Sequence, residues 1–259
     1  PTIYRMLVQE DLQQFSFANL RHCVSAGEPL NPEIIKVWRR ATGVIIRDGY
    51  GQTETTILCG SFPFIEPKYG SMGMPAPGIT LDIVDEEGDS LSANTEGDIA
   101  VRVRPETPMG LFKEYRADPE KTSESYRGDW YITGDRAYKD EDGYFWFVTR
   151  SDDVILSAGY RIGPFEVESA LIEHDAVLES AVVSSPDSTR GEVVKAFVVL
   201  TSNYEGSDFL VSKLQEHVKR TTAPYKYPRV IEFVSSLPKT VSGKIRRVEL
   251  RDREWHKGS

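Results

Sequence analysis

Cysteine is scarce in this sequence, with only Cys23 and Cys59 among 259 residues. Two cysteines are too few for a disulfide framework or a four-cysteine zinc site, and such usage is typical of a reducing compartment. The four histidines show no mutual spacing of a metal site. No apolar run approaches the roughly eighteen residues that a membrane-spanning helix needs. A disulfide framework, a four-cysteine zinc site and a membrane-spanning helix are therefore excluded.

Positive charge is also limited. The net charge is −9, which argues against a general nucleic-acid binder. The charge is uneven, because residues 219–259 hold 11 Lys and Arg against 4 Asp and Glu. This local excess is either a solvated face or a surface that holds a polyanion such as a nucleotide phosphate.

The chain has no initiator methionine, no signal sequence and no transit-like stretch. Residue 1 is proline, and an apolar segment follows at once. We therefore expect the chain to be the back part of a longer protein. Its composition, 39% hydrophobic and 27% charged, is typical of a folded globular protein.

Three stretches of different periodicity predict three structural regions. Residues 1–78 contain a predicted helix over 31–43 between two short apolar strands, which indicates an α/β sheet. Residues 79–150 alternate apolar and polar side chains and predict a small antiparallel sheet or barrel. Residues 151–259 follow the order β-α-β-β-α-β, which predicts a compact α+β domain. The boundary is expected near Arg150–Asp153.

Four segments combine glycine with small polar or charged residues, and each alone is most often a turn. They are Ser25–Pro29, Asp48–Glu54, Tyr131–Asp135 and Pro238–Lys244. Taken together and in this order, they resemble the adenylate-forming family of acyl-CoA synthetases, nonribosomal-peptide adenylation domains and luciferases.

Three further segments narrow the resemblance to the medium-chain acyl-CoA synthetases: Arg161–Pro164, Glu166–Leu171 and Ala223–Arg229. The resemblance covers essentially the whole chain. It implies the C-terminal part of the adenylate-forming fold, a mixture of α/β and α+β structure. Residues 1–151 would be the end of the large AMP-binding domain, with a sheet remnant and a small β-barrel. Residues 152–259 would be a small mobile lid.

The resemblance implies a nucleotide site in the first domain. We expect a loop over 48–54 after a buried strand, where α/β sheets place ligands and glycines permit close approach. There Tyr50 would pack on adenine, Thr53 would bond the α-phosphate, and Glu54 would ligate Mg²⁺. The full set that the resemblance assigns to ATP and AMP is Gly27, Glu28, Pro29, Asp48, Gly49, Tyr50, Gly51, Gln52, Thr53, Asp135, Arg150 and Arg161.

Several of these residues have a simpler interpretation. The segment over 27–29 can be a plain strand-to-helix link, in which Glu28 is only structural. Asp135 is assigned to the ribose hydroxyls, a role that suits an ionised carboxylate, but it can also belong to a turn after Gly134. Arg150 is assigned to the same ribose, or is a surface cation.

Lys244 is the catalytic residue that the resemblance implies. It would contact the carboxylate and the α-phosphate during adenylation and stabilise negative charge there. The segment is not a Walker A site, because Ile245 stands where that motif needs Ser or Thr. The alternative is a basic surface turn. Asp152 is expected to be the hinge about which the lid rotates between the two half-reactions.

Coenzyme A carries phosphates, so basic residues are expected on the small domain. The resemblance places Ala158, Gly159 and Tyr160 along the CoA path, and Gly159 suits a tunnel wall because it has no side chain. Surface solvation is the alternative for Arg190 and Lys219. The residues assigned around the CoA nucleotide are Arg190, Lys219, Tyr227, Pro228 and Arg229.

Gly51 bears on the acyl group. Acetate-selective relatives have tryptophan at this place, so glycine opens the pocket to medium-chain fatty acids and to aromatic acids. We expect Gly51 to face an apolar groove beside Thr53 and Glu54. Each methylene buried there would contribute about 0.8 kcal/mol.

The family's phosphate-binding loop has no counterpart here. We therefore expect this chain alone not to complete adenylation. The predicted partners are a carboxylic acid, ATP and CoA, with no nucleic acid and no membrane span. The predicted location is intracellular: the mitochondrial matrix in an animal, the cytoplasm in a prokaryote. Two alternatives stay open: a non-catalytic CoA- or nucleotide-binding module, and an adenylating enzyme that loads a carrier protein.

Overall fold

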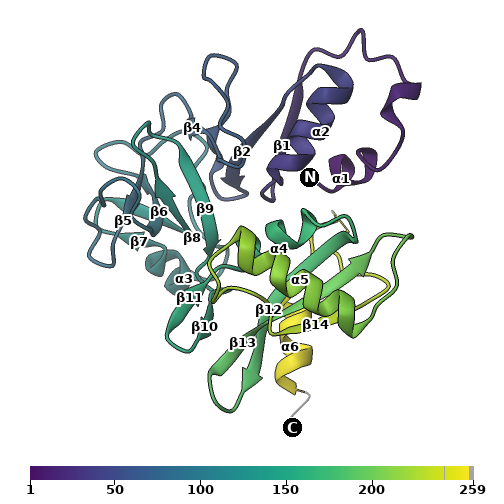
Figure 1. Cartoon of the computed structure of the whole chain (residues 1–259). Coiled ribbons are helices and arrows are strands. Elements are labelled where there is room, and N and C mark those ends of the chain that lie inside the picture. The colour runs from purple at the N-terminus through teal and green to yellow at the C-terminus, as the bar shows by residue number, and fades with distance from the viewer. Residues whose placement is uncertain (242, 257–259) are drawn as a thin grey trace. The chain divides into compact units, whose positions relative to one another are not determined.

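The computed structural model describes residues 1–241 and 243–256. Ser242, part of the fourth glycine segment, lies outside the described residues. The chain divides into two compact units, residues 1–148 and 149–259 (Figure 1). The division falls just before the boundary expected from the sequence. Within the described residues, no helix is long and apolar enough to cross a membrane.

The first unit begins with a four-stranded sheet in the order β1-β2-β3-β4. Strands β1 and β2 are parallel and are joined by helix α2. As predicted, Asn31 caps this helix and Gly43 ends it, with a left-handed φ of 75°. Ile34, Ile35 and Trp38 of α2 are buried. The elements of this part are α1 (Thr2–Leu7), a short 3-10 turn (Leu12–Gln14), β1 (Cys23–Ala26), α2 (Pro32–Thr42), β2 (Ile46–Gln52), β3 (Thr56–Gly60) and β4 (Met74–Pro75).

The region predicted as a small antiparallel sheet or barrel is a five-stranded sheet in which β5, β6, β8 and β7 are neighbours and β9 also pairs with β8. Its core, with Ile83, Ile99 and Phe145, continues into Leu58 and Cys59 of β3. The two sheets of the first unit therefore share one core. The elements are β5 (Leu81–Val84), β6 (Gly97–Arg102), α3 (Pro119–Glu124), β7 (Tyr126–Arg127), β8 (Trp130–Lys139) and β9 (Phe145–Arg150).

The second unit is a five-stranded sheet with helices on both faces (Figure 1). Side chains alternate along β13: Ala196 and Val198 belong to the cluster that contains α4 and α5 residues. Phe197 and Val199 belong to a cluster with Leu250 of α6. Both faces of β13 are therefore covered, which explains its continuous apolar run. The elements are β10 (Ile155–Ser157), β11 (Tyr160–Ile162), α4 (Pro164–Ile172), β12 (Val177–Asp187), β13 (Gly191–Leu200), α5 (Asp208–Thr221), β14 (Val230–Phe233) and α6 (Arg247–His256).

Helix α6 was not predicted. Only Leu250 and Glu254 of its ten residues are buried, so its sequence shows no apolar stripe of helical period. Ion pairs hold much of it instead: Lys195 with Glu254 at 2.8 Å, and Arg253 with Glu232 at 2.7 Å. Tertiary contacts, rather than local propensity, therefore stabilise this helix.

The segment between the two units suggests a proteolysis test. Arg150, Ser151 and Asp152 are exposed and form the end of β9 and a turn. Because exposed turns are preferred sites of nicking, brief trypsin treatment should cut after Arg150 and release two fragments. An Arg150→Gln variant should lose this cut. Early cleavage elsewhere, with residues 148–156 protected, would contradict this boundary.

Candidate functional site

The Asp48–Glu54 segment is a strand and a turn, not the loop expected. Strand β2 runs to Gln52 and pairs antiparallel with β3. A Cβ on Gly49 would lie 2.8 Å from Ile57 Cδ1. The absence of a side chain at Gly49 therefore lets β2 and β3 approach each other, which is a common reason for glycine inside a strand.

The interpretation of Gly51 as an opening in an acyl groove is wrong for the same reason. A Cβ at this position would lie 1.8 Å from Thr56 O and 3.0 Å from Ile57 Cα. Any side chain here meets the backbone of β3 rather than an apolar groove. Replacing Gly51 by tryptophan would displace the β2–β3 pair, so the acyl-chain preference cannot be tested at this position.

Three of the predicted nucleotide residues, Tyr50, Gln52 and Asp135, are linked to one another by hydrogen bonds. The Oδ2 atom of Asp135 accepts hydrogen bonds from Tyr50 Oη and Gln52 Nε2, each at 2.6 Å. Gln52 Nε2 also donates to Thr133 O at 2.8 Å. Burial and the neighbouring Asp135 carboxylate raise the pKa of Tyr50 well above its usual value, so Tyr50 remains a donor. The Asp135 carboxylate is thus held from two positions on β2.

Asp135 lies in strand β8, and Gly134 before it has a φ of +76°. The register of β8 against β6 shifts between Asp98 and Ala100, so Thr133–Asp135 forms a bulge. Thr133 Oγ1 donates to Ile99 O within this bulge. Bulges redirect side chains, and this one carries the buried Asp135 to β2. The turn considered for Asp135 is therefore wrong.

Glu54 and Thr53 follow β2 in a turn. Thr53 is exposed, and Glu54 is half-buried. Glu54 Oε1 accepts a hydrogen bond from Tyr115 Oη at 3.2 Å. Tyr115 was not predicted as a site residue, because nothing in its local sequence pattern marks a contact with a residue 61 positions earlier.

The segment over 27–30 and Asp48 are also connected. Asp48 Oδ2 accepts from Leu30 N at 3.3 Å, and Oδ1 accepts from Gly49 N at 3.1 Å. Glu28 is paired with Arg5 at 2.9 Å, which favours its structural interpretation. Asp48 therefore ties the segment after Pro29 to β2. Burial raises the pKa of Asp48 to about 7.

In the second unit, the residues assigned to CoA form two groups. Ala158 N donates to Arg190 O at 3.3 Å, so the Ala158–Gly159 turn lies against Arg190. Both turn residues have positive φ, 50° and 85°. Tyr160 stacks on Tyr225 with ring centroids 4.2 Å apart. Tyr225 was not assigned to the site, although it lies in a segment that supports the family resemblance.

The second group surrounds Tyr227. Lys219 Nζ lies 4.3 Å from the centre of the Tyr227 ring, and Arg229 Nη1 donates to Tyr227 Oη at 2.8 Å. Gln215 Nε2 donates to the carbonyls of Pro228 and Arg229. Lys219 also pairs with Glu216 at 2.6 Å. Arg161 is exposed on β11. The assigned residues thus present cations and aromatic rings on neighbouring segments.

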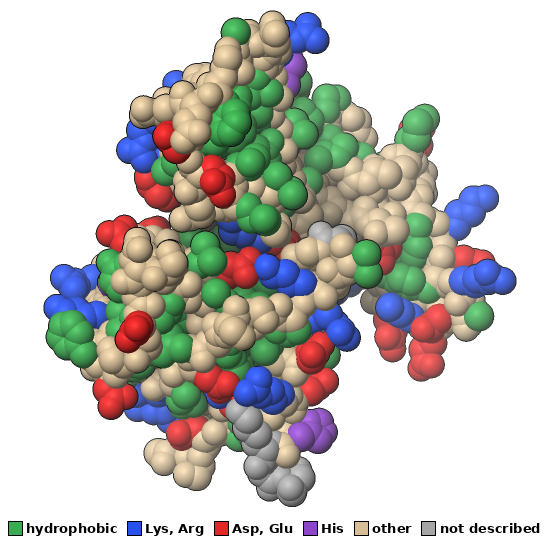
Figure 2. Space-filling model, turned by 90° about the vertical axis from the view of Figure 1, so that its right-hand side faces the viewer, with side chains coloured by type: hydrophobic (Ala, Val, Ile, Leu, Met, Phe, Trp, Pro, Cys, Tyr) green, Lys and Arg blue, Asp and Glu red, His purple; other side chains and the backbone are tan. Residues whose placement is uncertain are grey.

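Most of the described cations over 219–259 are paired with carboxylates. On the face shown in Figure 2, Lys and Arg side chains are interspersed with Asp and Glu side chains. Within the described residues, no carboxylate lies within ion-pair distance of Lys244, which is exposed. The cations of this region that pair with carboxylates are Lys219, Lys226, Lys239, Arg246, Arg247, Arg251 and Arg253.

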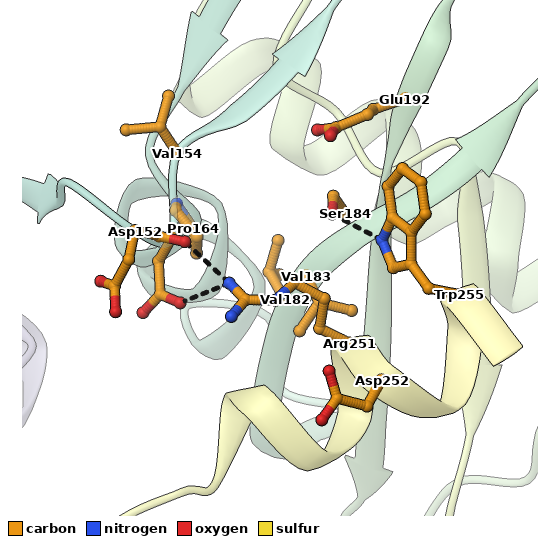
Figure 3. A pocket seen from close by; sticks show the side chains of 11 residues that line it. Asp152, Val154, Pro164, Val182, Val183, Ser184, Glu192, Arg251, Asp252 and Trp255 are labelled. Carbon is orange, nitrogen blue, oxygen red and sulfur yellow. Dashed lines mark hydrogen bonds and ion pairs between the residues drawn. The ribbon is translucent and has the colours of Figure 1, made fainter.

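A cavity of about 250 Å³ lies beneath α6, beside the expected hinge turn (Figure 3). Arg251 Nη1 donates to Asp152 O at 2.7 Å and to Asp153 Oδ1 at 3.1 Å. Trp255 Nε1 donates to Ser184 Oγ on the other side. Lys244 does not line this cavity, so the cavity is separate from the predicted catalytic position. Arg150 pairs with Asp152 at 3.0 Å.

The pKa of Asp48 predicts a pH-dependent stability. A carboxyl whose folded-state pKa is raised binds protons more tightly in the folded state, so its contribution to stability falls as pH rises from about 4 to about 7. Asp48→Asn removes this loss. The difference in unfolding free energy, variant minus wild type, should rise by up to about 4 kcal/mol between pH 4 and pH 8. Urea unfolding at several pH values measures it. A pH-independent difference would contradict the raised pKa.

Known proteins match almost the whole chain. The family model "AMP-binding enzyme" matches residues 1–115, and "AMP-binding enzyme C-terminal domain" matches residues 166–244. Acyl-coenzyme A synthetase ACSM3, mitochondrial, of Mus musculus is 62% identical over 257 residues. That match covers 98% of this chain and 44% of the relative. Human acyl-coenzyme A synthetase ACSM5, mitochondrial, is 59% identical over 99% of this chain and 45% of its own length.

Solved structures share the fold. An anthranilate CoA ligase, AuaEII, in complex with anthranoyl-AMP superposes with a TM-score of 0.89 at 37% identity, over 99% of this chain and 49% of that chain. A benzoate CoA ligase from Burkholderia xenovorans LB400 gives a TM-score of 0.85 at 35% identity, over 97% of this chain and 50% of that chain. The chain thus spans less than half the length of the relatives named above and about half of these ligases. Together these matches establish that the chain belongs to the adenylate-forming superfamily and corresponds to the C-terminal portion of its medium-chain acyl-CoA synthetases.

Proposed function

We propose that the protein containing this chain is an ATP-dependent acyl-CoA ligase. A carboxylate would attack the α-phosphorus of ATP to form an acyl-adenylate and release pyrophosphate. The thiol of CoA would then attack the acyl carbonyl to form the thioester and release AMP. The observation that carries this proposal is the state of Lys244. Its neighbours Lys239, Arg246 and Arg247 are paired with carboxylates, whereas Lys244 is exposed and available for an anionic ligand.

Lys244 would act by electrostatic stabilisation. Negative charge accumulates around the α-phosphorus when the carboxylate attacks, and a positioned ammonium stabilises that charge more than it stabilises the ground state. In the thioester step the thiol attacks the acyl carbonyl, so negative charge does not accumulate around the phosphorus through nucleophilic attack there. Lys244 is therefore assigned to the first half-reaction.

The first unit would hold the nucleoside. Asp135 is proposed to accept hydrogen bonds from the ribose, and its orientation is supported by Tyr50 and Gln52. Because these donors pre-orient the carboxylate, less ordering is left to occur on binding. Tyr50, Thr53, Arg150, Arg161 and the segment over 27–29 keep their proposed nucleotide roles, with Asp48 acting through Leu30 rather than by contact.

Glu54 is the residue proposed to hold Mg²⁺. Within the described ranges, no group of three or more His, Cys, Asp or Glu side chains could hold a metal ion alone. This agrees with the usual behaviour of Mg²⁺ at nucleotides, where one or two carboxylates suffice and phosphate oxygens and water complete the shell. The bound ion would neutralise phosphate charge. Tyr115 would keep the Glu54 carboxylate in place through its hydrogen bond.

The second unit would bind CoA and act as a mobile lid that turns about Asp152. The rings of Tyr160, Tyr225 and Tyr227 and the cations Lys219 and Arg229 offer stacking surfaces and positive charge, which suit an adenine and phosphates. A carrier protein would instead need a protein-sized docking surface. The stacked and cationic groups favour CoA over that alternative.

The proposed acids are medium-chain fatty acids, with aromatic acids as alternatives. The support is similarity: the ACSM relatives are acyl-CoA synthetases, and two of the matching structures are ligases of anthranilate and benzoate. Because those ACSM relatives are named as mitochondrial, we propose the same location if this protein comes from an animal.

The main test is Lys244→Ala in the full-length protein. Adenylation, measured by release of pyrophosphate, should fall by about 100-fold or more, since a single electrostatic donor at a transition state often contributes that much. Thioester formation from supplied acyl-adenylate should stay within about twofold. Lys213→Ala, which removes an exposed lysine of α5, is the matched control and should change neither rate.

Two outcomes would count against this proposal. If the full-length protein binds ATP and CoA but releases no pyrophosphate with any acid, it is a binding module. If it forms acyl-adenylate but transfers the acyl group only to a carrier protein, the carrier-loading alternative is correct.

The acyl preference requires a direct comparison of substrates. The full-length protein should show its highest kcat/KM with acids of intermediate length when acetate, butyrate, octanoate, palmitate and benzoate are compared. Each methylene that enters an apolar pocket contributes about 0.8 kcal/mol, so octanoate should exceed acetate by at least tenfold. Highest activity with acetate would exclude the medium-chain assignment.

A further inference from the structure

Lys244 lies on a tight turn whose backbone is held at several points. Thr240 N donates to Lys244 O at 2.8 Å, and Lys244 N donates to Thr240 Oγ1 at 3.1 Å. Gly243 N donates to Thr240 O at 2.9 Å, and Gly243 has a φ of +85°, which glycine adopts readily. Arg246 N donates to Pro238 O at 2.9 Å, which closes the turn at its base.

Ion pairs anchor both arms of this turn to the body of the second unit. On the first arm, Lys239 Nζ contacts both oxygens of Glu179 in β12, at 2.6 and 2.9 Å. On the second arm, Arg247 forms a bidentate ion pair with Glu168 of α4: Nε donates to Oε1 at 2.9 Å and Nη2 donates to Oε2 at 2.6 Å. A bidentate pair fixes the orientation of the two side chains as well as the distance between them.

Glu168 is the more constrained partner. It is 4% exposed, and its Oε1 also accepts a hydrogen bond from Val182 N at 2.8 Å. The carboxylate thus joins α4, β12 and the start of α6 at one buried point. Arg247 lies three residues after Lys244, so the pair constrains the chain close to the catalytic candidate.

Helix stability does not explain Arg247. It is the first residue of α6, where the helix dipole favours negative rather than positive side chains. A buried ion pair is also weak evidence for overall stability, since apolar replacements of whole pairs are often neutral. Fixed geometry is what such a pair supplies, and the segment that it fixes carries Lys244.

We propose that the buried Glu168–Arg247 pair positions Lys244 for adenylation. This inference rests on the proposed function of Lys244. Arg247 and Glu168 would touch neither substrate. They would act through the turn, by holding the Lys244 backbone where its ammonium meets the reacting phosphate.

The test uses the full-length protein with Arg247→Lys and Glu168→Gln. Arg247→Lys keeps the positive charge but cannot make the bidentate contact with both oxygens of Glu168. Glu168→Gln keeps an acceptor for Val182 N but loses the negative charge. Adenylation should fall about 10- to 100-fold in each, because small misplacements of a catalytic group are that costly. Thioester formation from supplied acyl-adenylate should stay within about twofold. Arg253→Lys is the matched control: it alters another ion-paired arginine of α6 and should leave both rates unchanged.

A double-mutant cycle separates a positioning role from an independent one. In the Lys244→Ala background, adding Arg247→Lys should reduce adenylation by less than about twofold, because residues that act as a unit are not additive. Multiplicative losses would overturn the inference. So would unchanged adenylation in Arg247→Lys and Glu168→Gln, or an equal fall of both half-reactions, which would mark the pair as purely structural. Unchanged adenylation in Lys244→Ala itself would instead overturn the proposed function of Lys244, and the inference with it.

Discussion

The carboxylate of Glu168 is almost completely removed from water, and the second unit is organised around that constraint. A buried charge is tolerated only when it is paired and hydrogen-bonded. Glu168 meets this requirement through the guanidinium group of Arg247 and through Val182 N, so α4, β12 and α6 must come together at one place. The last helix can then cover the second face of the sheet with few apolar residues of its own. The Lys244 turn lies between this anchor and the Lys239–Glu179 pair.

The first unit uses carboxylates in a related way. Asp135 of β8 is bonded to Tyr50 and Gln52 of β2, so one side chain connects the two sheets of this unit. Asp48 connects β2 to the backbone at Leu30. In both places residues proposed for the nucleotide site also hold the strands that carry them. Site geometry and local structure would therefore be coupled, because a change in Asp135 alters a contact between the two sheets as well as the proposed ribose contact.

The charges of the C-terminal part show how composition can mislead. Its basic excess suggested either a solvated face or a polyanion site. In the structure most of these cations are paired with carboxylates of α4, β12, β14 and neighbouring positions, many of them far away in sequence. Among the described lysines of this part, Lys244 is the one for which no carboxylate lies within ion-pair distance, and only the folded positions of the other charges show this.

The sequence by itself determined the local elements and the family. The Asn31 and Gly43 caps, the alternating strands over 79–150, the apolar runs of β12 and β13 and the order β10-α4-β12-β13-α5-β14 all follow from short-range patterns, which is why they were predicted. The tertiary structure alone decided the rest. The Asp135 contacts span 83 and 85 residues and the Glu168–Arg247 pair spans 79, and no local pattern encodes such pairings. Helix α6 lacks an apolar stripe, so only its tertiary partners reveal it. Gly51 was misinterpreted because its role depends on the backbone of β3, since the direction in which a missing side chain would point is a property of the folded chain.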